Sequence, residues 1–153
     1  MLFNHNFKKP NMCFIIPDKQ WYYNEDMLIT KQSNIEQIFI NGIENRIEQI
    51  IANLLDNSIS FSKKKGNIFV YVSNTSDKKI MVKIIDEGEG FKEKDTSRIF
   101  KRFYSNRPDK FGEHSGLGLN IVKNLVDLHD GEIIASNRVD NEGAIIDIKF
   151  PSA

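Results

Sequence analysis

Three short groups of residues in this chain combine polar side chains or glycines at spacings that suit ligand binding. Asn53 and Asn57 lie four positions apart in NLLDN, and Asp86 opens DEGEGF directly after the apolar run KIMVKII. SGLGL at 115–119 adds two glycines. Carboxamides and carboxylates exchange hydrogen bonds with ligands, and glycines let a ligand approach the backbone.

The two asparagines are predicted to lie on a helix. Residues four apart project from the same side of a helix, and here that side borders the apolar stripe. Carboxamides at such a position need hydrogen-bond partners, or they cost stability. The alternative is a pair of capping or surface asparagines, which an asparagine-rich chain would also contain.

The two glycine-containing groups are predicted to lie at the end of a strand and the start of a helix. Asp86 can accept a hydrogen bond from a ligand amino group, whereas a glycine-rich turn with solvated acids is the simpler alternative. Gly116 and Gly118 open a helix, where free N–H groups and the positive dipole end favour a phosphate. Each glycine inside a helix costs about 1 kcal/mol relative to alanine, which disfavours a passive role.

The elements that must position these groups follow from apolar periodicity. One helix is predicted from Glu44 to KKKG at 63–66, and a second over 116–131 with one apolar side. The apolar side of the second helix is predicted to be Leu117, Ile121, Leu125 and Leu128.

Strands are predicted as two hairpins and two short pieces. The hairpins pair 67–73 with 79–86 and 132–138 with 144–150, and the short pieces are 12–16 and 34–40. This order of elements predicts a two-layer α/β sandwich, with helices on one face of a mixed, mostly antiparallel sheet. The polar stretch after Phe103 has no periodicity and is predicted to be a mobile loop.

Taken together and in order, these motifs resemble the ATP-binding catalytic domain of sensor histidine kinases in the GHKL superfamily. The pattern is Asn-x-x-x-Asn on a helix, Asp-x-Gly-x-Gly after a strand, Phe-x-x-Phe, then Gly-x-Gly opening a helix. The resemblance implies a Bergerat-type fold over about residues 35–153, preceded by a lead-in segment at 1–34 that can supply the start of the sheet.

The resemblance also implies a role for each motif. Asn57 would coordinate the magnesium ion that bridges the ATP phosphates, with Asn53 supporting phosphate or metal. Asp86 would bind the adenine amino group, with Gly88 and Gly90 letting the nucleotide sit against the backbone. The other residues implied in nucleotide binding are Phe100 and Phe103 of the phenylalanine box, Ser115, Gly116, Leu117 and Gly118 of the second glycine box, and Lys101, Arg102 and Arg107.

A lid at about 104–115 would lie between these two boxes. The three basic residues are candidates for contact with phosphate or with a partner domain. The alternative is that they form a solvated basic surface. Ser58 stands where the family usually has alanine, and Ser60 where a basic residue often reaches toward phosphate.

Within the superfamily, the residue at position 53 distinguishes ATP-hydrolysing proteins from histidine kinases. ATP-hydrolysing members usually carry a glutamate four residues before the metal-binding asparagine, as general base. This chain has Asn53 there, and an amide cannot accept the proton. A histidine kinase is therefore expected, with a nucleotide-binding regulatory module or an ATP-hydrolysing protein as alternatives.

The acceptor histidine is expected on a separate dimerisation hairpin, upstream or in another chain. HNFKKP places His5 and Pro10 at the family's spacing, but lysine and asparagine replace its usual residues. Without that hairpin, a monomer that works with a response regulator is expected.

Composition limits the binding partners and the cellular location that are expected for the domain. Lys plus Arg and Asp plus Glu balance at 21 each, which gives no net field toward nucleic acid or an anionic membrane. Cys13 is the single cysteine, so no internal disulfide can form. A cytoplasmic segment without direct membrane contact is expected, whose full-length parent can be an inner-membrane sensor.

Overall fold

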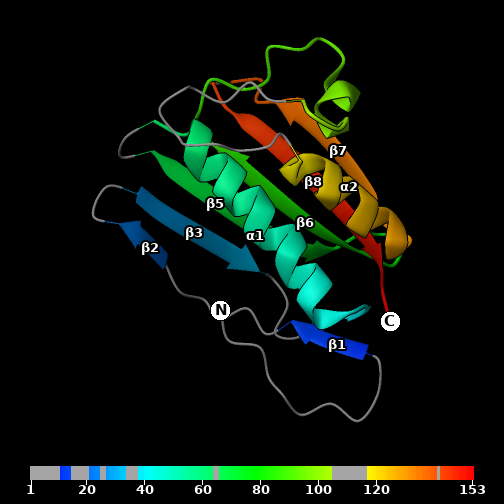
Figure 1. Ribbon diagram of the computed structural model, residues 1–153. Helices are drawn as coiled ribbons and strands as arrows, with labels where there is room; N and C mark the ends of the chain where they lie inside the picture. The colour runs from blue at the N-terminus through cyan, green and yellow to red at the C-terminus, as the bar shows by residue number, and fades with distance from the viewer. Residues whose placement is uncertain are drawn as a thin grey trace.

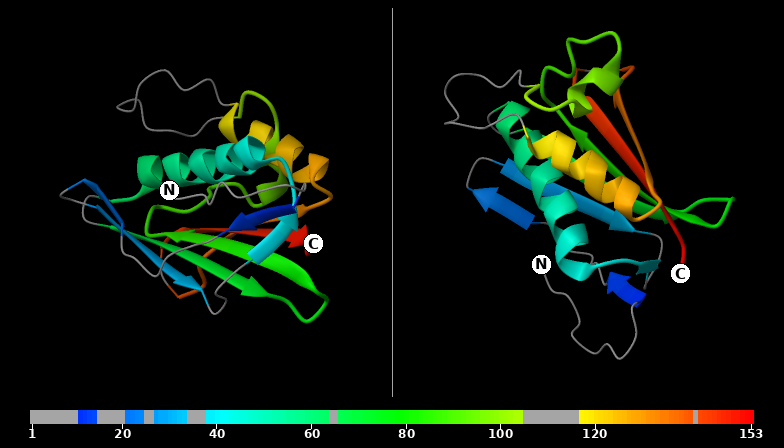
Figure 2. Two further views of the ribbon diagram at one scale, coloured as in Figure 1. Left: turned by 90° about the horizontal axis from the view of Figure 1, so that it is seen from below. Right: turned by 45° about the vertical axis from the view of Figure 1, so that its right-hand side comes forward.

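The described part of the chain folds into two layers. The computed structural model describes residues 11–14, 21–24, 27–33, 38–63, 66–104, 117–140 and 142–153. Helices α1 (Glu44–Phe61) and α2 (Gly118–Leu128) lie across one face of a β-sheet (Figure 1). The views in Figure 2 place both helices on the same side of that sheet, which confirms the predicted α/β sandwich.

The main sheet has six strands in the order β2-β3-β5-β6-β8-β7. The β3–β5 pair is parallel and every other neighbouring pair is antiparallel. The strands are β2 (Trp21–Asn24), β3 (Met27–Ser33), β5 (Asn67–Asn74), β6 (Lys79–Asp86), β7 (Glu132–Asn137) and β8 (Ala144–Pro151). Both predicted hairpins are confirmed, whereas β2 and β3 were not predicted as strands.

A second, two-stranded sheet lies directly before α1 in the chain. Strand β1 (Asn11–Phe14) pairs antiparallel with β4 (Ile38–Asn41), so both predicted short strands form. Ile40 also bridges to Ser152, and the Ala153 N–H donates to the Phe39 carbonyl at 3.1 Å. The C-terminal end of the chain therefore lies beside β4, directly before α1.

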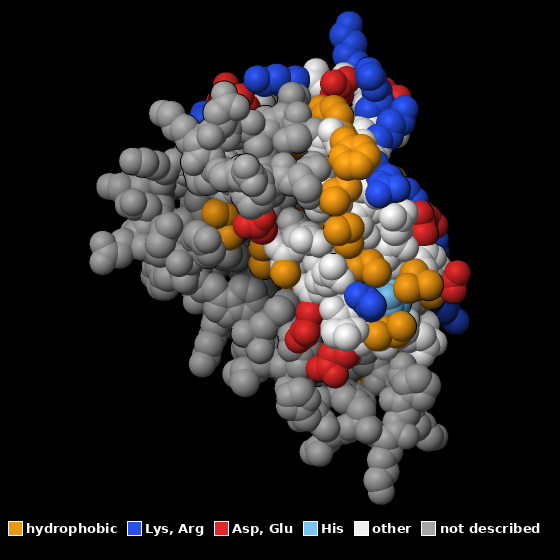
Figure 3. All heavy atoms as spheres, in the orientation of Figure 1, with side chains coloured by type: hydrophobic (Ala, Val, Ile, Leu, Met, Phe, Trp, Pro, Cys, Tyr) orange, Lys and Arg blue, Asp and Glu red, His pale blue; other side chains and the backbone are white. Residues whose placement is uncertain are grey.

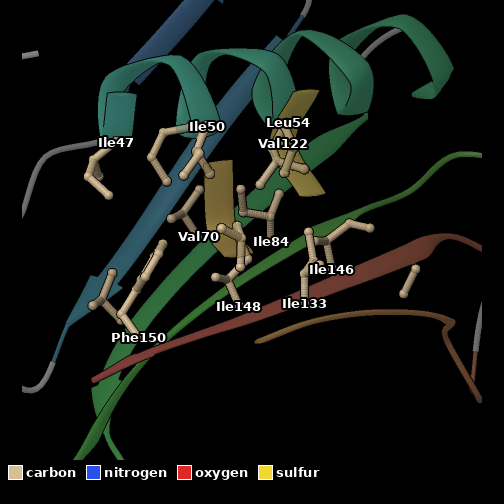
Figure 4. Close-up of a cluster of buried hydrophobic side chains, with 14 of the residues drawn as sticks. Ile47, Ile50, Leu54, Val70, Ile84, Val122, Ile133, Ile146, Ile148 and Phe150 are labelled. Atoms are coloured by element: carbon tan, nitrogen blue, oxygen red, sulfur yellow. The ribbon is translucent and has the colours of Figure 1, made fainter. Parts of the chain in front are cut away.

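The core lies between the helices and the sheet. Alternate residues of β5, β6 and β8 turn inward, as expected for strands with one covered face. Figure 4 shows these side chains meeting those of α1 and α2. The labelled residues, all buried, are Ile47, Ile50, Leu54, Val70, Ile84, Val122, Ile133, Ile146, Ile148 and Phe150.

The predicted apolar side of α2 is wrong in one respect. Val122 and Val126 are fully buried, whereas Leu128 is 63% exposed. Helix α2 carries two adjacent apolar rows, and packing against α1 and the sheet selects the valine row. Hydrophobic side chains remain at the surface in the region of α2 (Figure 3). None of the described helices is long and apolar enough to cross a membrane.

His129 joins the end of α2 to the start of α1. The Ile43 N–H donates to His129 Nε2 at 3.1 Å, so the ring proton is on Nδ1, which lies 2.6 Å from the Leu125 carbonyl oxygen. The ring is buried and packs edge-on against Phe150. His129 therefore caps the start of α1 with a buried ring.

Replacement of Leu54 by alanine is expected to lower the free energy of unfolding by about 2–5 kcal/mol, because a 1% exposed side chain leaves a cavity. Leu128→Ala is the matched control, since that leucine is 63% exposed, and its effect should stay within about 0.5 kcal/mol. Denaturant unfolding measures both. A loss in Leu128→Ala as large as that in Leu54→Ala would show that Leu128 of α2 faces the core.

Candidate functional site

The C-terminal half of α1 carries both predicted asparagines. Asn53 and Asn57 are each partly buried on the helix that covers the sheet. The side-chain nitrogen of Asn53, Nδ2, is itself buried and has no hydrogen-bond partner among the described residues. Leaving such a donor unpaired costs about 1–3 kcal/mol, so this position favours a ligand with an acceptor oxygen.

Asp86 ends β6 and is 4% exposed. Its Oδ1 accepts hydrogen bonds from the Gly88 N–H at 2.9 Å and the Ala144 N–H at 3.1 Å. The Ser58 side chain of α1 also acts on this carboxylate, in the direction that lowers its pKa. Three segments of the chain therefore converge on one buried acidic group.

The protonation of Asp86 reflects two opposing effects. Burial raises the pKa of Asp86 above its ordinary value of 3.8, because the charged form loses its hydration. The hydrogen bonds from Gly88, Ala144 and Ser58, together with the charge of Arg138, act in the opposite direction. These donors make the carboxylate a fixed acceptor at the end of the strand.

Gly88 and Gly90 are required by contacts within the protein. A Cβ on Gly88 would lie 2.4 Å from the Phe61 carbonyl oxygen, where the end of α1 meets the end of β6. Gly90 has φ +75°, and a Cβ there would lie 2.7 Å from Asn137 Oδ1. Ligand approach to these glycines remains a prediction.

Asn137 holds the segment that follows DEGEG against the end of β7. Its Oδ1 accepts from the Phe91 N–H at 2.6 Å, and its Nδ2 donates to the Phe91 carbonyl at 2.9 Å. Thr96 Oγ1 donates to the Ala135 carbonyl at 2.6 Å. Side chains thus continue the hydrogen bonding of the edge strand. Nothing in the local sequence marked these two residues.

The Phe-x-x-Phe motif lies at the end of a 3-10 helix, η1 (Thr96–Phe100). Phe100 is buried and its carbonyl accepts from Asn120 Nδ2 at 2.9 Å, which ties η1 to the first turn of α2. Phe103 is 72% exposed, so only Phe100 packs into the core. Lys101 and Arg102 are exposed beside it, and the Arg102 guanidinium carbon lies 5.4 Å from the Phe103 ring centroid.

The start of α2 has an open backbone, and phosphate binding there remains a prediction. Leu117 precedes the helix and has no side-chain cap, and no described atom lies within 4 Å of a Cβ built on Gly118. Arg107, Ser115 and Gly116 lie outside the described residues, as do 105–115 of the predicted lid. His5 and Pro10 also lie outside the described part of the chain.

The end of α1 meets the turn after β6, because Ser62 bridges to Gly88 and Phe61 closely approaches Gly88. Ser58, directly after Asn57, acts on the pKa of Asp86. Sequence reasoning missed Ser58 and Ala144 as neighbours of Asp86. The buried position of Ser58 on the apolar stripe was the available signal, because a buried hydroxyl must find a partner.

Asp86→Asn is expected to stabilise the free protein increasingly as pH rises. A raised folded-state pKa gives stability that is fully present below about pH 4 and is lost as pH rises through that pKa. Asparagine does not titrate, and its oxygen can still accept from Gly88 and Ala144. Denaturant unfolding from about pH 4 to pH 8 should show a growing advantage for the variant. A difference that is constant over this range would contradict the raised pKa.

Asn137→Ala is expected to speed hydrogen exchange at the Phe91 amide and to lower the unfolding free energy by about 1 kcal/mol. The variant loses both bonds to the Phe91 backbone. Asn137→Asp, which keeps only an acceptor for the Phe91 N–H, should protect that amide better than alanine does. Asn74→Ala, at an exposed strand end, is the control. Unchanged exchange at the Phe91 amide in Asn137→Ala would show that the two Asn137 hydrogen bonds do not protect this segment.

Comparison with known proteins agrees with this geometry. Residues 42–153 match the family described as histidine kinase-, DNA gyrase B- and HSP90-like ATPase. The chain is 42% identical over 114 residues to the sensor protein ChvG of Agrobacterium fabrum, covering 72% of this chain and 19% of ChvG. It is 34% identical over 135 residues to the sensor protein KdpD of Clostridium acetobutylicum, covering 86% of this chain and 14% of KdpD.

Solved structures extend the similarity to the fold. The mycobacterial sensor histidine kinase MprB superposes with a TM-score of 0.70 at 25% identity, covering 81% of this chain and 82% of that one. The chain spans about a fifth or less of the length of ChvG and KdpD. The chain therefore belongs to the histidine kinase-, DNA gyrase B- and HSP90-like ATPase family, in which it corresponds to the ATP-binding catalytic domain of sensor histidine kinases.

Proposed function

We propose that this domain binds ATP with magnesium and donates the γ-phosphoryl group to a histidine on a separate helical hairpin. A response regulator would then receive the phosphoryl group. The observation that carries the proposal is a fixed, buried carboxylate at the end of β6 together with an amide donor of α1 that has no partner among the described residues. Asp86 is the carboxylate, held by Gly88 and Ala144, and Asn53 carries the amide.

The two ends of the nucleotide need different chemistry. In this proposal Asp86 accepts a hydrogen bond from the adenine amino group, because a carboxylate held by backbone donors cannot turn away. Asn53 Nδ2 donates to a phosphate oxygen and thereby gains the partner that it lacks among the described residues. Gly118 leaves the start of α2 open to phosphate, where free N–H groups favour an anion.

The residues also suit a magnesium ion. The side-chain oxygen of Asn57 is a hard oxygen ligand of the kind that magnesium accepts together with substrate phosphates. The ion, when bound, neutralises charge on the phosphates. Asn57 would hold it from α1, together with phosphate oxygens and water.

Transfer to histidine is favoured over hydrolysis by the side chain at position 53. An amide at this position cannot take a proton from water, so the chain provides no general base there. A neutral imidazole is already a nucleophile and needs less help to attack phosphorus. Catalysis by this domain would then consist of positioning and charge stabilisation.

The partners are inferred from relatives. ChvG and KdpD are named as sensor proteins, and a structure of histidine kinase ThkA contains the response regulator protein TrrA. For this chain, the dimerisation hairpin and the response regulator are proposals that follow from the domain assignment. Lys101 and Arg102 are exposed near Phe103 and are candidates for contact with a partner domain or phosphate. We also propose that the domain lies in the cytoplasm.

Calorimetric titration with a slowly hydrolysed ATP analogue, with and without magnesium, tests the proposal. The wild type should bind in a magnesium-dependent way, and Asn57→Ala should weaken binding about tenfold or more by removing the protein ligand. Asn45→Ala is the matched control, because Asn45 is exposed on the same helix. Melting temperatures exclude unfolding as the cause. Wild-type protein that binds no nucleotide would overturn the assignment.

Two further assays distinguish a kinase from a hydrolase and from a nucleotide-binding module. Phosphate release from ATP by the domain alone should be negligible for a kinase and continuous for a hydrolase. Mixing the domain with a histidine-bearing hairpin of a sensor kinase should produce an acid-labile phosphoprotein. Binding without transfer to any hairpin would leave the nucleotide-binding module as the function.

A further inference from the structure

Asn120, in the first turn of α2, forms a hydrogen bond outside its own helix. Its Nδ2 donates to the carbonyl oxygen of Phe100, the last residue of η1, at 2.9 Å. Its Oδ1 accepts from Asn124 Nδ2 at 3.4 Å, which holds the carboxamide from the other side. Asparagine near a helix start commonly bonds to backbone groups of its own turn, so a bond to a residue twenty positions away is a specific tertiary contact.

The first turn of α2 also has backbone donors that the helix itself does not use. The first hydrogen bond within the helix runs from the Ile121 N–H to the Leu117 carbonyl at 2.8 Å. The N–H groups of 118–120 therefore have no acceptor within the helix, and Leu117 supplies no side-chain cap. The Asn120 side chain does not cap them either, because it bonds to η1.

Two cations directly follow the carbonyl that Asn120 binds. Lys101 and Arg102 are next in the chain after Phe100, and both are exposed. Their backbone is fixed by two hydrogen bonds, from the Lys101 N–H to the Arg98 carbonyl at 3.1 Å and from the Tyr104 N–H to the Lys101 carbonyl at 3.3 Å. The bond to Phe100 therefore brings the backbone of a basic pair beside the first turn of α2.

We propose that Asn120 is a positioning residue that brings Lys101 and Arg102 to the nucleotide phosphates at the start of α2. This inference rests on the proposed nucleotide binding and deepens it. Exposed charges are screened by salt, so the position of η1 relative to α2 decides how strongly the two cations act on a phosphate. Without the Asn120 bond, the cations lose their fixed distance from the open turn. Phe100 stays buried, so the segment is loosened and not detached.

The test is a double-mutant cycle on the whole chain, measured as affinity for a slowly hydrolysed ATP analogue with magnesium by calorimetry. Asn120→Ala should weaken binding about threefold, and Lys101→Gln combined with Arg102→Gln should weaken it about fivefold, within the range of exposed charge pairs. The triple variant should bind no more weakly than the variant without the two cations, because Asn120 acts through them.

Asn124→Ala is the matched control. It removes an exposed asparagine one turn further along α2 and keeps the bond between Asn120 and Phe100. It should bind the analogue as the wild type does. An equal loss of affinity in the two single asparagine variants would overturn the proposal, because the effect would then come from α2 itself. Asn120→Leu, which is similar in size and cannot donate, carries the comparison if thermal melting shows that Asn120→Ala is unfolded.

The outcomes distinguish this proposal from the proposed function. If Asn120→Ala weakens binding equally with and without the two cations, its role is structural only, and nucleotide binding stays intact. Wild-type affinity in folded Asn120→Ala would also overturn the proposal. Unchanged affinity in the variant without the two cations would do the same, and would leave a partner domain as their contact. A wild type that binds no nucleotide would overturn both this proposal and the proposed function.

Discussion

The burial of one carboxylate constrains much of this domain. Asp86 is 4% exposed, and a buried acid is tolerated only where donors surround it. Those donors come from the turn after β6 and from the start of β8, and the end of α1 bridges to the same turn, so three segments meet at one point. The approach is close: a Cβ on Gly143 would lie 2.1 Å from the Asp86 carbonyl oxygen. Glycine before β8 is thus as necessary as the acid itself.

Elsewhere in the domain, side chains connect elements that the sheet's own hydrogen bonds do not join. Asn137 fastens the segment at Phe91 to the end of β7, and Asn120 fastens the start of α2 to Phe100. His129 bonds the end of α2 to Ile43, directly before α1. These contacts are short-range and directional, so they set the positions of the helix ends more finely than apolar packing can.

The hairpins, α1 and the layered architecture could be predicted from the sequence because each depends on a local pattern. Alternation in 67–73 and 79–86 shows a covered face, and Ile47, Ile50 and Leu54 repeat with helical spacing. The strands β2 and β3 lack that clear alternation, and β3 forms by parallel pairing with β5, far along the chain. The apolar side of α2 was ambiguous because leucines and valines form two adjacent rows on it, and the sheet and α1 together select one.

By itself, the sequence determined the motifs, their order and the family to which they point, because residue types at short spacings are a local property. Asn53, Asn57, Asp86 and the glycines were all identifiable in that way. Only the tertiary structure decided what each of them contacts. It gave Asp86 its donors Gly88 and Ala144, gave Gly88 and Gly90 their close neighbours, and left the Asn53 amide without a partner in the described part of the chain. The reason is physical: hydrogen bonding and burial depend on distances between segments far apart in the chain, which no local pattern records.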